Sequence, residues 1–115
     1  MGTPFSISAE HLPEGLGLVS VSGELDVDTA PQLGTCLTEC GADGDRLVVL
    51  DLRGVTFMDS SALGTLVAGW KGFVRIGTGL RLVLDQPNLL RLFELSGLSE
   101  VFSISDTLEQ ALENA

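Results

Sequence analysis

Apolar and polar residues alternate in two stretches near the start of the chain. Residues 5–9 and 16–22 carry an apolar side chain at every second position over most of their length. A period of two is typical of strands with one buried face, so each stretch predicts a β-strand. The Pro-Glu-Gly sequence at residues 13–15 favours a turn between them, which predicts a short hairpin.

After Thr29 the apolar spacing changes to three and four residues, which predicts a helix whose first turn tolerates Pro31. The apolar run at residues 47–50, which ends in Asp51, is instead continuous. Such a run is typical of a strand that helices cover on both faces. The apolar face of the predicted helix consists of Leu33, Cys36, Leu37 and Cys40.

Helical and strand-like patterns continue to alternate in the second half of the chain. Residues that prefer helix ends, such as Ser, Asp, Pro and Gly, mark the boundaries. The predicted elements are a helix capped by Ser60 or Ser61 and ended by Gly77, a strand at residues 80–84, a helix that starts at Pro87, a strand at residues 101–104 and a helix capped by Asp106.

Strands and helices therefore follow each other in the order ββαβαβαβα. This order predicts an α/β fold with a mixed, mostly parallel sheet of about five strands and about four helices. A chain of 115 residues has room for one core, so we expect a single domain over residues 1–115. In open sheets of this kind, functional residues collect in the loops beyond the carboxyl ends of the strands.

The charge of the chain limits the partners that it can bind. It has 6 basic and 16 acidic residues, a formal net charge of −10. Such a surface repels nucleic-acid phosphates and anionic lipid headgroups, and no apolar run approaches the ~18 residues of a membrane span. We therefore expect no direct DNA binding and no membrane insertion. With a single pair of cysteines and no signal-peptide pattern, we expect a cytoplasmic location.

The chain is poor in residues that carry out catalysis. Lys71 is the only lysine and His11 the only histidine, which removes most schemes that depend on an amine or an imidazole. Cys36 and Cys40 are four residues apart on the predicted helix, where core packing explains them better than metal binding. We expect no catalytic residue, no metal site, no cofactor and no enzymatic activity.

The segment after the central strand is the most informative part of the sequence. A helix begins near Asp59, Ser60 and Ser61, where free backbone N–H groups stabilise an acidic or phosphorylated side chain. One interpretation is that these residues only cap the helix. The other is a phosphorylation switch, with Phe57 and Met58 either in contact with a partner or packed beneath the loop.

Two segments resemble a known family. Residues 57–64, Phe-Met-Asp-Ser-Ser-Ala-Leu-Gly, look like the signature around the phosphorylated serine of the STAS domain family, in particular of its bacterial anti-sigma factor antagonists. Residues 22–30, Ser-Gly-Glu-Leu-Asp-Val-Asp-Thr-Ala, look like the second characteristic segment of that family. The resemblance covers nearly the whole chain. One departure is Ala62, where the family often has glycine.

The resemblance implies a partner-switching protein. The unphosphorylated form would bind an anti-sigma factor that is also a serine kinase, and the bound sigma factor would be released. ATP and magnesium belong to that kinase. Phosphorylation of Ser60, with Ser61 as the second choice, would end the binding, and a serine phosphatase would restore it.

The same resemblance predicts the partner-binding surface. It would consist of Asp26, Asp28, Thr29, Phe57, Met58, Asp59, Ser60 and Ser61. For Asp28 and Thr29 the alternative is that they cap the first helix.

One other function is compatible with the sequence, and a second is not. A STAS domain can also be a scaffold or a subunit of a signalling or transporter-associated complex, without regulation of a sigma factor. A receiver domain has similar length and an aspartate where Asp51 lies. Receivers also need a lysine near the last strand, whereas Lys71 falls inside a predicted helix.

Overall fold

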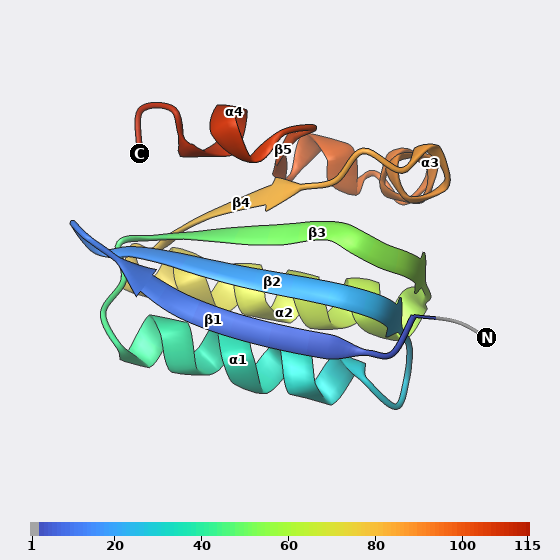
Figure 1. The fold of residues 1–115 in the computed structure, drawn as a ribbon, viewed down its shortest axis with the longest axis horizontal. Coiled ribbons are helices and arrows are strands. Elements are labelled where there is room, and N and C mark those ends of the chain that lie inside the picture. The colour runs from blue at the N-terminus through green and yellow to red at the C-terminus, as the bar shows by residue number, and fades with distance from the viewer. Residues whose placement is uncertain (1–2) are drawn as a thin grey trace.

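The five strands form one mixed sheet in the order β1-β2-β3-β4-β5, as the computed structural model of residues 3–115 shows (Figure 1). β1 runs antiparallel to β2, and the other neighbours are parallel. The predicted order ββαβαβαβα and the mixed sheet are confirmed. The elements are β1 (Ser6–Leu12), β2 (Leu16–Leu25), α1 (Ala30–Ala42), β3 (Leu47–Met58), α2 (Ser60–Ile76), β4 (Gly79–Val83), α3 (Pro87–Leu95), a 3₁₀ turn (Leu98–Glu100), β5 (Ser103–Ser105) and α4 (Leu108–Leu112).

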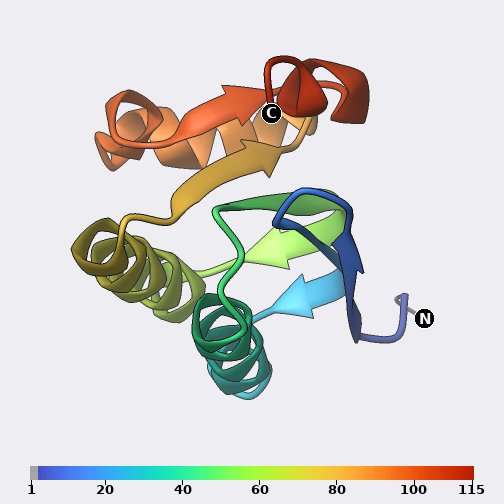
Figure 2. The ribbon, with the colours of Figure 1, turned by 90° about the vertical axis from the view of Figure 1, so that its left-hand side faces the viewer.

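Helices α1, α2 and α3 cover one face of the sheet and enclose the main core (Figure 2). α1 and α2 approach closely because Gly69 has no side chain, and a Cβ at this position would lie 2.8 Å from Leu37 Cδ1. Beneath α3, Phe102 makes edge-to-face contacts with Phe93 and Trp70. The apolar faces predicted from helical spacing are therefore the faces that pack on the sheet.

α4 covers part of the opposite face. Val49 and Val83 are fully buried beneath it and pack with Ala111, together with the half-buried Leu16 and Leu18. The sheet thus has helices on both faces at its centre, which explains the continuous apolar run of β3. Within residues 3–115, no helix has the length and hydropathy needed to cross a membrane.

β3 is longer than predicted. The sequence favoured an end at Asp51, but the strand continues to Met58. Its pairing with β2 contains register shifts: Ser20 is opposite Asp51, whereas Ser22 is opposite Gly54. β3 thus has an extra residue at this point, a β-bulge. The bulge breaks the period of two in the sequence, so the second half of the strand could not be recognised from the pattern of apolar residues.

Two boundaries near the carboxyl terminus also differ from the prediction. The last strand is Ser103–Ser105 rather than residues 101–104, because the chain first makes the 3₁₀ turn. Thr107 caps α4 in place of Asp106, and its hydroxyl oxygen accepts a hydrogen bond from the Gln110 N–H. The predicted end of α2 at Gly77 is confirmed, with a left-handed φ of 78°. The domain bounds of 1–115 stay a prediction, and residues 1–2 lie outside the described part.

Candidate functional site

The parallel register of β2 and β3 brings the two sequence motifs together. Leu25 at the end of β2 pairs with Met58 at the end of β3. The next residue, Asp59, donates its backbone N–H to the Leu25 carbonyl at 3.2 Å. The turn after β2 and the start of α2 are therefore neighbours at the carboxyl end of the sheet (Figure 1).

Asp59 is the residue that caps α2. Its backbone is extended and its Oδ1 accepts a hydrogen bond from the Ala62 N–H at 3.1 Å. The prediction that Ser60 or Ser61 caps this helix is therefore wrong. Both serines are the first residues of the helix, and both are exposed. Among the described residues, the Ser60 hydroxyl has no hydrogen-bond partner, so it is free for modification.

The start of α2 favours negative charge. The first N–H groups of a 17-residue helix have few partners within the helix and lie at the positive end of its dipole. Phosphate groups bind at such ends in many proteins. A phosphate on Ser60 would thus lie where the helix stabilises its negative charge.

The turn after β2 is held by its own side chains. Asp26 Oδ1 accepts hydrogen bonds from the N–H groups of Asp28 and Thr29, at 2.9 and 3.1 Å. The Thr29 hydroxyl donates to the Glu24 carbonyl at 2.7 Å and accepts from the Asp26 N–H at 2.9 Å. Thr29 occupies the cap position of α1 but makes no side-chain capping bond. Asp26 and Thr29 therefore shape the turn, and Asp28 is left exposed.

Phe57 and Met58 point to opposite sides of β3. Phe57 is 47% exposed, whereas Met58 is only 5% exposed and belongs to the core. The burial of Met58 favours the alternative of packing beneath the loop, and its role in partner contact stays a prediction. Sequence reasoning missed Val27, which is 66% exposed between two aspartates of the turn. An apolar residue in an acidic turn is a usable signal for a contact surface.

Asp51 is part of an ion pair on β3. Its carboxylate accepts two hydrogen bonds from the Arg53 guanidinium, at 2.8 and 2.9 Å. Burial raises the pKa of Asp51, but the hydrogen bonds from Arg53 outweigh this effect and hold the pKa below its ordinary value. Lys71 lies within α2. Neither residue has the arrangement that receiver chemistry requires.

The two cysteines lie on the inner side of α1, as predicted. Both are free thiols, and burial raises the pKa of Cys40 to about 12 and also raises the pKa of Cys36. Protonated thiols are poor nucleophiles and poor metal ligands. In the part of the chain that the structure describes, no group of three His, Cys, Asp or Glu side chains could hold a metal ion.

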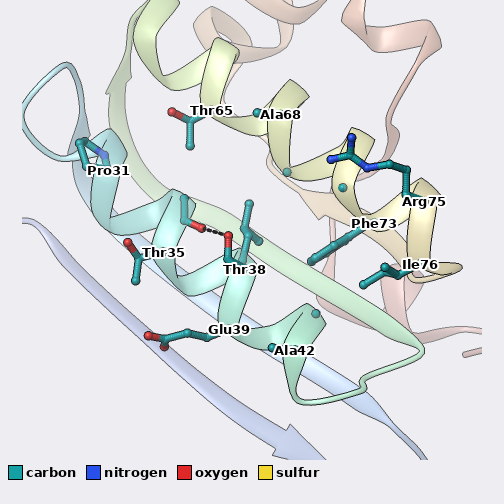
Figure 3. A pocket seen from close by; sticks show the side chains of 15 residues that line it. Pro31, Thr35, Thr38, Glu39, Ala42, Thr65, Ala68, Phe73, Arg75 and Ile76 are labelled. Atoms are coloured by element: carbon teal, nitrogen blue, oxygen red, sulfur yellow. Dashed lines mark hydrogen bonds between the residues drawn. The ribbon is translucent and has the colours of Figure 1, made fainter.

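An open groove of about 970 Å³ lies between α1 and α2 (Figure 3). It extends from Pro31 at the start of α1 to Ile76 at the end of α2, and small side chains and glycines form most of its lining. Glu39 and Arg75 are its charged members. The described residues that line it include no cysteine, histidine or lysine, so the groove supplies no nucleophile of these kinds.

Comparison with known proteins agrees with the fold and with the family that the sequence resembles. The model of the STAS domain family matches residues 7–111. An anti-sigma-B factor antagonist from Staphylococcus aureus (strain NCTC 8325 / PS 47) is 35% identical over 91 residues, which cover 79% of this chain and 84% of the relative. The protein of the same name from Bacillus subtilis (strain 168) is 34% identical over 95 residues, 83% of this chain and 86% of the relative.

Solved structures lead to the same family. An anti-sigma factor antagonist from Mycobacterium paratuberculosis superposes with a TM-score of 0.86 at 34% identity, over 95% of this chain and 92% of the other. The antagonist SpoIIAA shares the fold at 20% identity, with a TM-score of 0.79 over 94% of both chains for its unphosphorylated form. The chain therefore belongs to the STAS domain family and is homologous to bacterial anti-sigma factor antagonists.

Proposed function

We propose that this protein is an anti-sigma factor antagonist that phosphorylation of Ser60 switches off. The unphosphorylated form binds an anti-sigma factor that is also a serine kinase, and the sigma factor is released. A serine phosphatase returns the phosphorylated protein to the active form. The protein itself is a binding partner and not an enzyme, and with a sigma factor regulator as its partner it acts in the cytoplasm.

The observation that carries this proposal is the environment of Ser60. Its hydroxyl is exposed at the start of a long helix, next to the residue that caps the helix, and makes no hydrogen bond within residues 3–115. The homology to anti-sigma-B factor antagonists supports the same assignment. SpoIIAA, which has the same fold, is known in a phosphorylated form.

The contact surface surrounds that serine. Exposed apolar side chains, Phe57 and Val27, flank the acidic residues Asp28 and Asp59. Apolar side chains at the centre of an interface provide most of the binding free energy, whereas charges decide which partner fits. The partner surface that fits this site has a hollow for Phe57.

Phosphorylation changes this surface by charge. A phosphate adds about −1.5 to −2 charges at pH 7, next to Asp59 and on a chain that already carries −10. Inside a fitted interface that charge must be desolvated or meet the acidic groups of the partner. A loss of about 3 kcal/mol weakens binding by roughly 160-fold, which is enough for a switch.

The test begins with mass spectrometry of the purified protein after incubation with ATP-Mg²⁺ and extract from its native host. We expect one added phosphate, located on Ser60, present in the matched control Ser61→Ala and absent in Ser60→Ala. A purified anti-sigma factor kinase is then titrated with Ser60→Ala and Ser60→Asp. We expect Ser60→Asp to bind at least about tenfold more weakly, because it carries a negative charge at the same position.

Two outcomes would contradict the proposal. One is the absence of phosphate on Ser60 when the kinase in the extract is active on another substrate. The other is equal affinity of Ser60→Ala and Ser60→Asp for the kinase. Either result would favour a STAS scaffold without a phosphorylation switch.

A further inference from the structure

The carboxyl half of β3 has a strand neighbour on one side only. Pairing with β4 ends at Asp51 opposite Val83, whereas β3 continues to Met58 (Figure 1). On the side of β4, the backbone carbonyls beyond Asp51 therefore need other hydrogen-bond donors, because an unpaired buried carbonyl is costly.

The side chain of Gln86 supplies these donors. Its Nε2 donates to the carbonyls of Leu52, Arg53 and Val55, at 2.8, 3.1 and 2.7 Å. Its Oε1 accepts a hydrogen bond from the Asp85 N–H at 2.9 Å. Gln86 occupies the cap position of α3 but makes no side-chain bond to that helix. The amide group is therefore used for β3 and not for α3.

The carbonyls that Gln86 binds lie at the bulge of β3. Successive carbonyls of a regular strand point to opposite edges, so one amide group can bind those of Leu52 and Arg53 only where the strand is irregular. The next residue, Gly54, packs against β2 so closely that a Cβ on it would lie 2.8 Å from Ser22 Cβ. Gln86 on one side and β2 on the other thus hold the bulge in place.

A bulge bends its strand and changes the direction of everything that follows. Here the strand leads, five residues after Arg53, to Met58 and directly on to Asp59 and Ser60. Asp59 then makes the hydrogen bond to Leu25 that joins the start of α2 to the turn after β2. A second register shift follows, between the pairs Gly23–Val55 and Glu24–Phe57, so this bulge and the second one together set where the start of α2 lies.

We infer that Gln86 is a positioning residue for Ser60: by holding the bulge of β3, its side-chain amide fixes the cap residue Asp59 and the phosphoacceptor relative to the turn after β2. That the location of Ser60 matters for phosphorylation rests on the proposed function. The location of the start of α2 is a property of the free protein and can be measured without any partner.

The test compares Gln86→Met, which keeps the length of the side chain and removes its donors, with the matched control Gln32→Met on the exposed side of α1. Amide hydrogen exchange is followed by NMR at two reporters: Asp59 N–H, bonded to Leu25, and Ala62 N–H, bonded to the Asp59 side chain. Gln86→Glu, which replaces the donors by a carboxylate of the same shape, provides a second variant should Gln86→Met unfold.

We expect exchange at both reporters to rise by at least about tenfold in the Gln86 variants, because local opening needs fewer bonds to break. The amides of Val48 and Leu50, on the part of β3 that has strands on both sides, should change less than about twofold, as should all amides of Gln32→Met. A residue with only a general structural role would raise exchange at Val48 and Leu50 by the same factor as at the reporters.

The inference would be overturned if the Asp59 and Ala62 amides of both Gln86 variants exchanged at the wild-type rate. It would also be overturned if exchange were accelerated equally throughout the core.

Phosphorylation is then measured with the host extract, and we expect a lower rate of phosphorylation at Ser60 in Gln86→Met than in Gln32→Met. If wild-type protein gains no phosphate, the proposed function fails, and the exchange data still decide whether Gln86 positions the start of α2.

Discussion

His11, the one histidine in the sequence, lies between two aspartates. It is at the end of the sheet that is farther from Ser60. Its Nδ1 is 3.0 Å from Asp45 Oδ2 and its Nε2 is 3.1 Å from Asp43 Oδ2. The hydrogen bond with Asp45, helped by the charges of both aspartates, raises the pKa of His11 above 6.5. These contacts join the end of β1 to the loop before β3.

A pKa raised by folding makes stability depend on pH. The stabilisation from protonated His11 is fully present below pH 6.5, the ordinary value, and is lost as the pH rises through the pKa of the folded protein. We expect the stability difference between wild type and His11→Gln, measured by urea unfolding, to decrease over that interval. An NMR titration of the single imidazole signal gives the pKa of His11 in the folded protein directly.

The two aspartates should differ in their effect on His11. Asp45 makes the largest contribution, so Asp45→Asn should lower the pKa of His11 more than Asp43→Asn does. A folded pKa at or below 6.5 in the wild-type protein would show that these contacts do not persist in solution.

At the scale of single elements, the start of α2 combines capping with the proposed phosphorylation site. Asp59 caps the helix, so Asp59→Ala should lower the free energy of unfolding by about 1 kcal/mol. Asp59→Asn keeps an oxygen that can accept the Ala62 N–H and should be close to wild type. Urea unfolding measures both, and the neighbouring Ser61→Ala, which removes no cap, should change stability by less than about 0.5 kcal/mol.

The pair of Asp59 variants separates two effects of one carboxylate. Asp59→Asn removes the charge beside Ser60 and keeps the cap, so a change in kinase binding with unchanged stability is an electrostatic effect. Wild-type stability of Asp59→Ala would mean that the capping bond contributes nothing to the fold.

At the scale of the whole molecule, we expect phosphorylation to change the surface and leave the fold intact. Ser60 is exposed, and its hydroxyl makes no hydrogen bond within residues 3–115. The start of α2 stabilises the added charge. NMR amide shifts should therefore change in the turn after β2 and the first turns of α2, and remain constant in β4, β5 and α4. Shift changes throughout the sheet would instead indicate a conformational switch.

The order of elements could be predicted from the sequence because apolar spacing reflects local geometry. A helix repeats every 3.6 residues and a strand every two, and Gly77 or Pro87 marks a boundary by its own backbone preference. The prediction failed where the period is broken, at the bulge of β3 after Asp51. It also failed where several adjacent residues can all cap a helix, as with Asp59 and Ser60.

The motif for the site could likewise be identified in the sequence, but the direction of each side chain could not. Phe57 and Met58 are both apolar, and only the continuation of β3 makes one exposed and the other buried. Val27 is exposed because the side chains of Asp26 and Thr29 form the turn around it.

By itself, then, the sequence determined the α/β class and the order of the elements and pointed to the two segments of the candidate site, since each of these depends on residues close together in the chain. The tertiary structure decided the register of β2 and β3, which residue is exposed and which is buried, and the contacts of Gln86 and His11. Those contacts join residues 31 to 34 positions apart. Such pairs are set by the packing of whole elements, and no local pattern of residues encodes them.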